Sequence, residues 1–179
     1  DSELKTIEQV ACPSAGSCGG QFTANTMACI SEALGLALTN SAMTPATYIE
    51  RDKYGIERGK AVMNLIEKNI RPRDIVTLDS LRNAAVVVAA TGGSTNAALH
   101  LPAIANEAGI NFTLRDVVEI YKSTPYIGDM SPGGKYVAKD LYDVGGVPIV
   151  IKSLLDGGFI NGDCMTVSGK TIGENHKET

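Results

Sequence analysis

The sequence lacks several features that mark whole classes of protein. Its longest purely apolar run, Ala84–Ala90, is far shorter than the ~20 residues of a membrane-spanning helix. The formal net charge is −4, and no basic stretch carries interleaved aromatic residues, as nucleic-acid-binding surfaces do. The first residues are polar and acidic, so we expect no secretory leader. The sequence therefore predicts neither a membrane nor a nucleic-acid partner.

Cysteine is also scarce. The 179 residues contain four cysteines, Cys12, Cys18, Cys29 and Cys164. Without a secretory signal, these thiols do not indicate a disulfide framework. We expect a reducing compartment, the cytoplasm or an organelle in a eukaryote, in which the thiols are free or bound to metal.

Familiar nucleotide-binding and hydrolase motifs are missing as well. No Gly-x-Gly-x-x-Gly is present, and no Gly-Lys-Ser/Thr follows Gly92-Gly93. The two histidines do not assemble into a Ser/His/Asp or Cys/His arrangement. We expect His100, between two leucines, to be a core histidine, and His176 to lie inert in a polar, unstructured tail.

What is present is a series of helical patterns. The length suits one domain, and the interpretation is a single helix-rich α/β unit over residues 1–179. Val86–Val88 would suit a strand, but the capping sequence Thr77–Ser80 favours a helix there. A short strand is predicted over 162–169. Helices are predicted over residues 2–10, 23–38, 47–69, 81–91, 95–108, 114–122, 135–144 and 148–156.

The cysteine loop, residues 11–22, is the strongest chemical signal. Cys18 lies in Gly-Ser-Cys-Gly-Gly just before a predicted helix start, where glycines let N–H groups approach sulfur and the helix dipole stabilises a thiolate. The alternative is a small buried thiol, but the surroundings favour a metal or cluster ligand. Six positions separate Cys12 from Cys18, so no CxxC or closed zinc site is formed, and co-ligands must come from elsewhere. Cys12 is predicted to be a bystander, and Cys29 and Cys164 to be core residues.

A second candidate site follows Thr91. It comprises Gly92, Gly93, Ser94, Thr95 and Asn96. Glycines followed by hydroxyl residues at a helix start create N–H groups suited to a carboxylate or phosphate. The same pattern equally suits a tight corner between two helices, and both interpretations stay open.

Further motifs accompany these two segments along the chain. In chain order, the motifs are Cys12–Met27, Glu32–Leu36, Gly92–Leu101, Pro132–Tyr136, Gly145–Pro148 and Thr166–Asn175. Together they resemble the dihydroxy-acid dehydratases, within the wider family that includes phosphogluconate and sugar-acid dehydratases. The branch assignment rests mainly on Cys18-Gly-Gly-x-Phe-Thr-Ala-Asn-Thr-Met27, in which Gln21 stands where Met is expected.

The resemblance implies an iron–sulfur hydro-lyase that converts 2,3-dihydroxy-3-methyl acids to 2-oxo acids in branched-chain amino-acid synthesis. In such enzymes a cluster iron acts on the leaving 3-hydroxyl, Mg²⁺ orients the substrate, and a deprotonated serine removes the C2 proton. Cys18 matches the last of the three cluster cysteines, whereas Cys12, Cys29 and Cys164 match no ligand position. The cluster type, 2Fe–2S or 4Fe–4S, stays open. The full enzyme is expected to be a homodimer, with residues 92–96 at the active-site floor or the dimer contact.

By this resemblance the chain is the later portion of the N-terminal α/β domain, inactive by itself. The remaining cluster and magnesium ligands are expected upstream, and the serine base with a further magnesium ligand downstream. Two other functions stay open: a sugar-acid (aldonate) dehydratase of the same family, and a non-catalytic scaffold that binds anions at residues 92–96.

Overall fold

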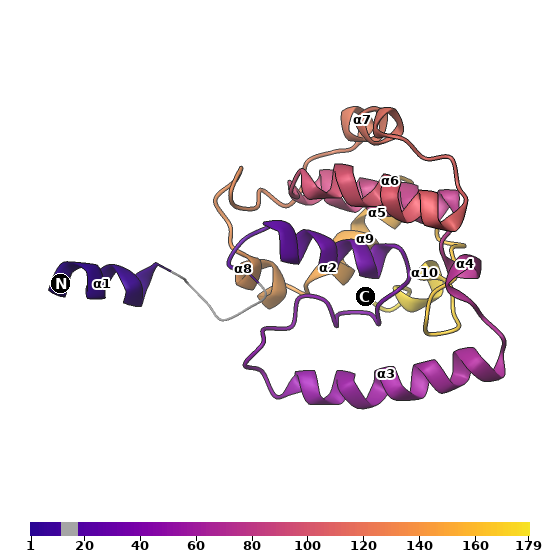
Figure 1. Cartoon of the computed structure of the whole chain (residues 1–179), viewed down its shortest axis with the longest axis horizontal. Coiled ribbons are helices and arrows are strands. Elements are labelled where there is room, and N and C mark those ends of the chain that lie inside the picture. Colours follow the sequence, from indigo (N-terminus) through magenta and orange to yellow (C-terminus); the bar gives the residue numbers. More distant parts are fainter. Residues whose placement is uncertain (12–17) are drawn as a thin grey trace.

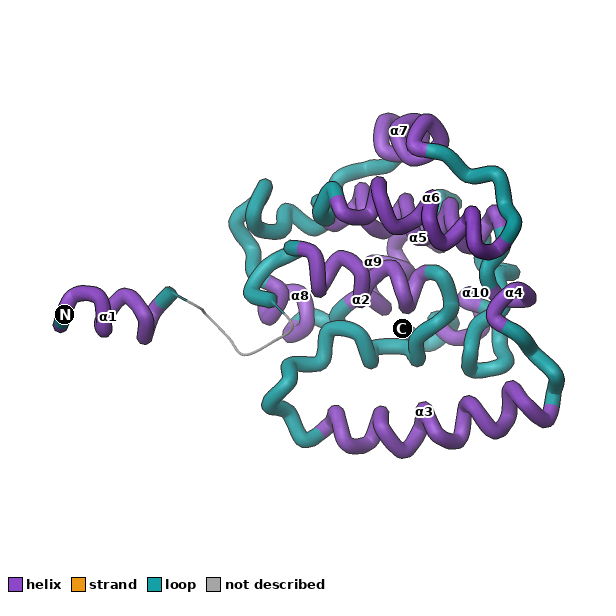
Figure 2. The backbone as a smooth tube through the Cα atoms, in the orientation of Figure 1, coloured by secondary structure: helices purple, strands orange, loops and turns teal. Residues whose placement is uncertain are grey.

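The computed structural model describes residues 1–11 and 18–179, and within these ranges the chain forms helices joined by loops (Figures 1 and 2). None of the helices described is long and apolar enough to cross a membrane. The described ranges hold isolated bridges, Met130–Tyr136 and Met165–Thr171, but no strand. The helices are α1 (Ser2–Val10), α2 (Thr23–Ala33), α3 (Glu50–Glu67), α4 (Pro72–Ile75), α5 (Leu78–Thr91), α6 (Asn96–Ala108), α7 (Leu114–Ser123), α8 (Ala138–Asp143), α9 (Val147–Asp156) and α10 (Ile172–Asn175).

Helix α5 forms the centre of the core. It packs against α2, α6, α7 and α9, and its valines Val86–Val88 are buried. At its start, Thr77 Oγ1 accepts a hydrogen bond from Ser80 N (3.1 Å), and Ser80 Oγ accepts one from Thr77 N (2.8 Å). The helix predicted from this capping sequence is therefore confirmed. Its valines suit a helix here because other helices enclose it on several sides.

Helix ends differ from the prediction where the backbone adopts positive φ. Helix α2 ends at Ala33 rather than residue 38, because Gly35 has φ +84° and turns the chain out of the helix. A Cβ at Gly35 would lie 2.6 Å from Met165 O, so a side chain does not fit there. Helix α3 ends at Glu67, shortly before Asn69 at φ 51°.

The predicted strand over 162–169 is wrong. The segment consists of turns, in which Thr166 Oγ1 accepts hydrogen bonds from Asn175 Nδ2 (2.9 Å) and Ser168 N (3.3 Å). Such side-chain bonds give the backbone an alternative to a strand ladder. The short strands of the α/β interpretation are therefore not confirmed, and the fold is helix-rich.

The expectation of an unstructured C-terminal tail is also wrong. Thr171 Oγ1 accepts from Glu174 N and Glu174 accepts from Thr171 N, which forms a capping box at the start of α10. His176 follows α10 and is buried, with its Nδ1 2.8 Å from Ile172 O. Burial lowers the pKa of His176.

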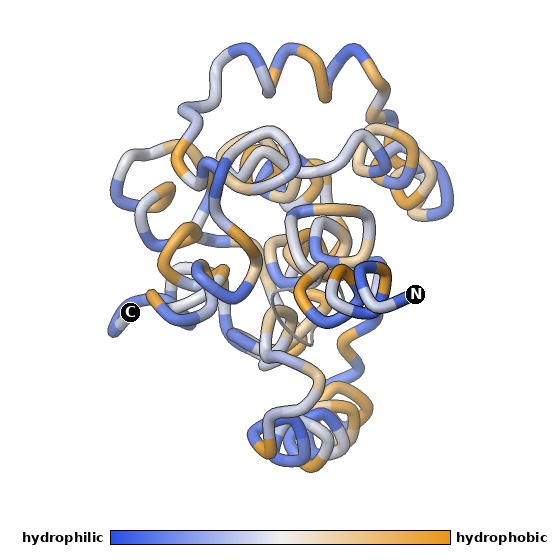
Figure 3. Tube along the Cα trace, turned by 90° about the vertical axis from the view of Figure 1, so that its left-hand side faces the viewer, coloured by the Kyte–Doolittle hydropathy of each residue, from blue (hydrophilic) through white to orange (hydrophobic). Residues whose placement is uncertain are grey.

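Two helices lie at the periphery. Helix α1 stands apart from the other helices, and all its residues are exposed (Figure 1). Helix α3 has no buried residue, and Figure 3 shows both hydrophilic and hydrophobic residues around it. The remaining helices form the body that carries the candidate site.

Candidate functional site

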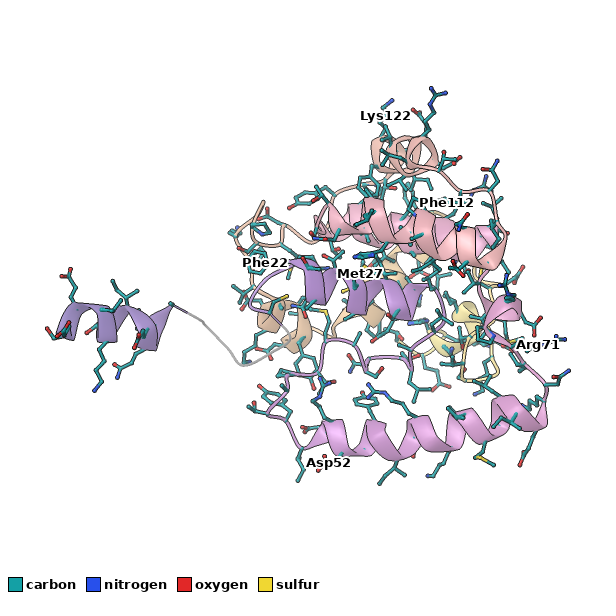
Figure 4. The ribbon with its side chains drawn as sticks, in the orientation of Figure 1. Phe22, Met27, Asp52, Arg71, Phe112 and Lys122 are labelled. Carbon is teal, nitrogen blue, oxygen red and sulfur yellow. The ribbon has the colours of Figure 1, made fainter. Side chains whose placement is uncertain are left out.

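Cys18 lies against the first turn of α2 and is hydrogen-bonded to it. Its half-buried Sγ accepts a hydrogen bond from the backbone N–H of Asn25 (3.3 Å) and donates one to Gly20 O (3.3 Å). Phe22, labelled at the start of α2 in Figure 4, occupies the N-cap position and has no acceptor side chain. The sulfur therefore takes the place of the capping oxygen that first-turn N–H groups normally require.

The residues after Cys18 are held by a distant segment. Gly19 O accepts from Ala138 N (3.0 Å), and Gln21 N donates to Ser131 O (2.7 Å). A Cβ at Gly20 would lie 2.7 Å from Ser131 O, so this close approach requires glycine. The turn that presents the thiol is thus fixed on one side by α2 and on the other by the loop before α8.

The second candidate segment, residues 92–96, lies against the same first turn of α2. Ser94 N donates to Thr26 Oγ1 (2.9 Å), and Asn96 Nδ2 donates to Thr23 Oγ1 (2.7 Å). A Cβ at Gly93 would lie 3.1 Å from Thr26 Cγ2, which shows how closely the two segments pack. The structure therefore brings the N-termini of α2 and α6 together, next to the Cys18 turn.

The glycine part of the corner interpretation of residues 92–96 is confirmed, but a side-chain cap by Thr95 is not. Gly92 has φ 68° and closes α5, as a left-handed C-terminal glycine does. Thr95 stands at the N-cap of α6 without a side-chain capping bond, whereas Ser94 Oγ accepts from Asn96 N (3.3 Å). Anion binding by this segment stays a prediction.

The other described thiols are core residues. Burial raises the pKa of Cys29 to about 12, and its Sγ accepts from Gln21 Nε2 (3.3 Å). Cys164 is also buried, with its pKa raised by burial, although it lies in a turn rather than the predicted strand. Cys12 lies outside the described residues. A neutral, enclosed thiol is a poor metal ligand because the thiolate binds metal.

One thiol does not make a metal centre. Among residues 1–11 and 18–179, no three His, Cys, Asp or Glu side chains group together as a metal site. His100 is half-buried on α6 rather than enclosed in the core. Cys18 itself fits a cluster thiolate, because it combines partial exposure with an N–H donor aimed at sulfur.

Several residues around Cys18 were not predicted from the sequence. Asn25, Thr26 and Gln21 are buried polar residues that tie the turn to the core. The available signal was their polarity, because α2 was otherwise expected to be buried almost completely. Buried polar groups in such a helix need partners, and here the partners are the Cys18 turn and the 92–96 segment.

A family model for the N-terminal part of dihydroxy-acid/6-phosphogluconate dehydratases matches residues 1–175. The chain belongs to this dehydratase family. It is 71% identical over 175 residues to a dihydroxy-acid dehydratase of Pelagibacter ubique, covering 98% of this chain and 31% of that protein. It is 67% identical over 174 residues to the dihydroxy-acid dehydratase of Dinoroseobacter shibae (97% and 30%). The dihydroxy-acid dehydratase of Parvibaculum lavamentivorans is 65% identical over 178 residues (99% and 31%).

This member of the dehydratase family spans about a third of the length of the curated relatives it matches. The match includes the Cys18 turn, α2 and the 92–96 corner, which lie within residues 1–175. The site described above therefore lies within the N-terminal part of the dehydratases that the family model describes.

Proposed function

We propose that this chain is part of a dihydroxy-acid dehydratase, a hydro-lyase that converts 2,3-dihydroxy-3-methyl acids to 2-oxo acids in branched-chain amino-acid synthesis. The relatives named above, at 65–71% identity, support this activity over that of a sugar-acid dehydratase of the same family. The structural observation that carries the proposal is the half-buried Cys18 thiol, which receives an N–H bond from the start of α2.

Cys18 is proposed to ligate an iron–sulfur cluster, of 2Fe–2S or 4Fe–4S type. When bound, such a cluster supplies a Lewis-acidic iron for a leaving hydroxyl, and Mg²⁺ orients the substrate. One cysteine does not hold a cluster, so the other ligands, the magnesium ligands and the serine base belong to parts of the enzyme beyond this chain. The chain alone is therefore proposed to be inactive, and the full enzyme to be a cytoplasmic homodimer.

Residues 92–96 are proposed to contact the substrate carboxylate. These residues open α6 beside the first turn of α2, and the positive end of a helix dipole attracts anions. The N–H groups of Gly92, Gly93, Ser94 and Asn96 already donate within the protein, so the contact is proposed to involve Thr95. Thr95 is exposed and has no capping bond. Thr95→Ala in the full-length enzyme should therefore raise KM for the dihydroxy acid without changing iron content, whereas an unchanged KM would remove this segment from the binding site.

The activity is tested with the full-length enzyme carrying this chain. It should dehydrate 2,3-dihydroxy-3-methylbutanoate in preference to gluconate or 6-phosphogluconate, measured as 2-oxo acid formed. A preference for the sugar acids would establish the aldonate branch instead.

The ligand assignment is tested by Cys18→Ser, with Cys164→Ser as a control because Cys164 is a buried thiol of the core. Cys18→Ser should lose the cluster absorbance and bound iron, and Cys164→Ser should keep both. A full cluster in Cys18→Ser, or a stoichiometric cluster on the isolated 179-residue chain, would contradict the assignment.

A further inference from the structure

Asn25 makes three hydrogen bonds to the turn that carries Cys18. Its side-chain Nδ2 donates to Cys18 O (2.9 Å) and to Gly20 O (2.8 Å), and its backbone N–H donates to Cys18 Sγ (3.3 Å). The residue is 2% exposed, and its bond to Gly20 O is buried, whereas its two bonds to the half-buried Cys18 are partly buried. Buried hydrogen bonds of this kind restrain the groups they join more than exposed ones do.

The geometry of these bonds fixes the direction of the thiol. The backbone between the carbonyls of Cys18 and Gly20 consists of Gly19 and Gly20, and glycine by itself leaves such a turn free to adopt many conformations. One planar amide that binds both carbonyls sets the two peptide planes, and with them the Cα–Cβ bond of Cys18. The side chain of Asn25 thus restrains the conformation of a turn that its own glycines leave flexible.

The same bonds prepare the turn for a deprotonated sulfur. As a thiol, Cys18 Sγ donates its hydrogen to Gly20 O, and a thiolate has no hydrogen to donate. Gly20 O keeps its bond from Asn25 Nδ2, so the loss of the proton leaves this carbonyl paired. The N–H of Asn25 remains directed at the sulfur, where a donor stabilises negative charge.

We propose that Asn25 is a positioning residue for the cluster: it holds Cys18 in the orientation that binds iron. The proposal rests on the proposed function of Cys18 as a cluster ligand, and it assigns a separate role to a residue that does not itself ligate. Outer-shell partners of this kind change metal affinity by about 10–100-fold when they are removed.

The test compares Asn25→Ala with a matched variant in the full-length holoenzyme. Asn83→Ala is the matched control, because Asn83 is also 2% exposed. Its side chain makes two hydrogen bonds of 2.8 Å that join α5 to Asn161, and a longer one to Cys164 Sγ (3.5 Å). Iron release to a chelator and the electron paramagnetic resonance spectrum of the reduced cluster are measured. Both variants are studied at a temperature at which circular dichroism shows the helices intact.

Asn25→Ala should release iron at least about tenfold faster than the parent and shift the cluster spectrum, whereas Asn83→Ala should stay within about twofold. Asn25→Asp, of the same size, should release iron faster still, because a carboxylate would face the two carbonyls. Equal release from Asn25→Ala and Asn83→Ala, or an unchanged spectrum and release rate in both Asn25 variants, would overturn the proposal. Cluster loss in Cys18→Ser with normal release in Asn25→Ala would remove only the role of Asn25, while a retained cluster in Cys18→Ser would remove the ligand assignment itself.

Discussion

Glu32 is a buried carboxyl group near the end of α2, and its ionisation provides a direct test of the packing described above. Oε2 accepts a hydrogen bond from Asn40 N (2.9 Å) and Oε1 accepts one from Ala42 N (2.7 Å). These bonds favour the carboxylate, but the side chain is 4% exposed and burial has the larger effect. The result is a pKa raised from 4.5 to about 7.

The magnitude follows from linkage between ionisation and folding. In the unfolded chain Glu32 loses its proton near pH 4.5, whereas in the folded chain it keeps the proton until about pH 7. One pKa unit corresponds to about 1.4 kcal/mol, so the full effect is about 3 kcal/mol. Because the folded state holds the proton more tightly, this contribution to stability is present below pH 4.5 and is lost as the pH rises through 7.

Glu32→Gln removes the titrating group, so the difference in unfolding free energy between this variant and the parent should change with pH. Between pH 5 and pH 8, the variant should gain about 2.5 kcal/mol relative to the parent. Urea unfolding of the chain, followed by helix ellipticity at several pH values, measures this difference. Glu67→Gln is the control, because Glu67 is exposed at the end of α3.

The reasoning depends on the slope of this difference and not on its absolute value. The introduced amide places an N–H donor against a backbone N–H, and this cost does not vary with pH. If the Glu32→Gln and parent curves run parallel within about 0.5 kcal/mol, burial does not raise the pKa of Glu32 as described.

Two further predictions concern the core and the corner. Gln21 is buried and its Oε1 has no hydrogen-bond partner. Gln21→Met should leave the unfolding free energy within about 1 kcal/mol of the parent, because the hydrogen bonds lost and the cost of the unpaired oxygen removed are of similar size. A loss above about 2 kcal/mol in urea unfolding would contradict this. Gly92→Ala should lower the unfolding free energy by about 1–2 kcal/mol, because φ is 68° and a Cβ would lie 2.8 Å from Tyr126. Gly133→Ala, at a position with open space, should have a smaller effect in the same measurement, and equal effects would refute the strain argument.

Helix positions were predictable because their causes are local. Thr77 and Ser80 mark the start of α5 through their capping bonds. The long apolar run that follows is typical of a helix enclosed by other helices. The end of α2 was not predictable in the same way, because a single glycine is also tolerated inside a helix, at a cost of about 1 kcal/mol. The left-handed backbone of Gly35 ends the helix, and its close approach to Met165, a residue far away in the chain, leaves no room for a side chain.

The candidate site was also predictable only where its causes are local. The glycines around Cys18 and its place before a helix were enough to predict a thiol beside a helix N-terminus. The approach of residues 92–96 to this turn was not predictable, because it depends on how α5 and α6 pack against α2. The turn over 162–169 was mistaken for a strand because Thr166 and Asn175 form side-chain bonds that a periodicity argument does not include.

The bonds that hold Gly19 and Gln21 also bear on how the protein is made. Their partners, Ala138 and Ser131, come much later in the chain. During synthesis the ribosome releases residues 18–21 long before it releases these partners. The cysteine turn therefore reaches its final geometry only after the loop that precedes α8 has emerged from the ribosome.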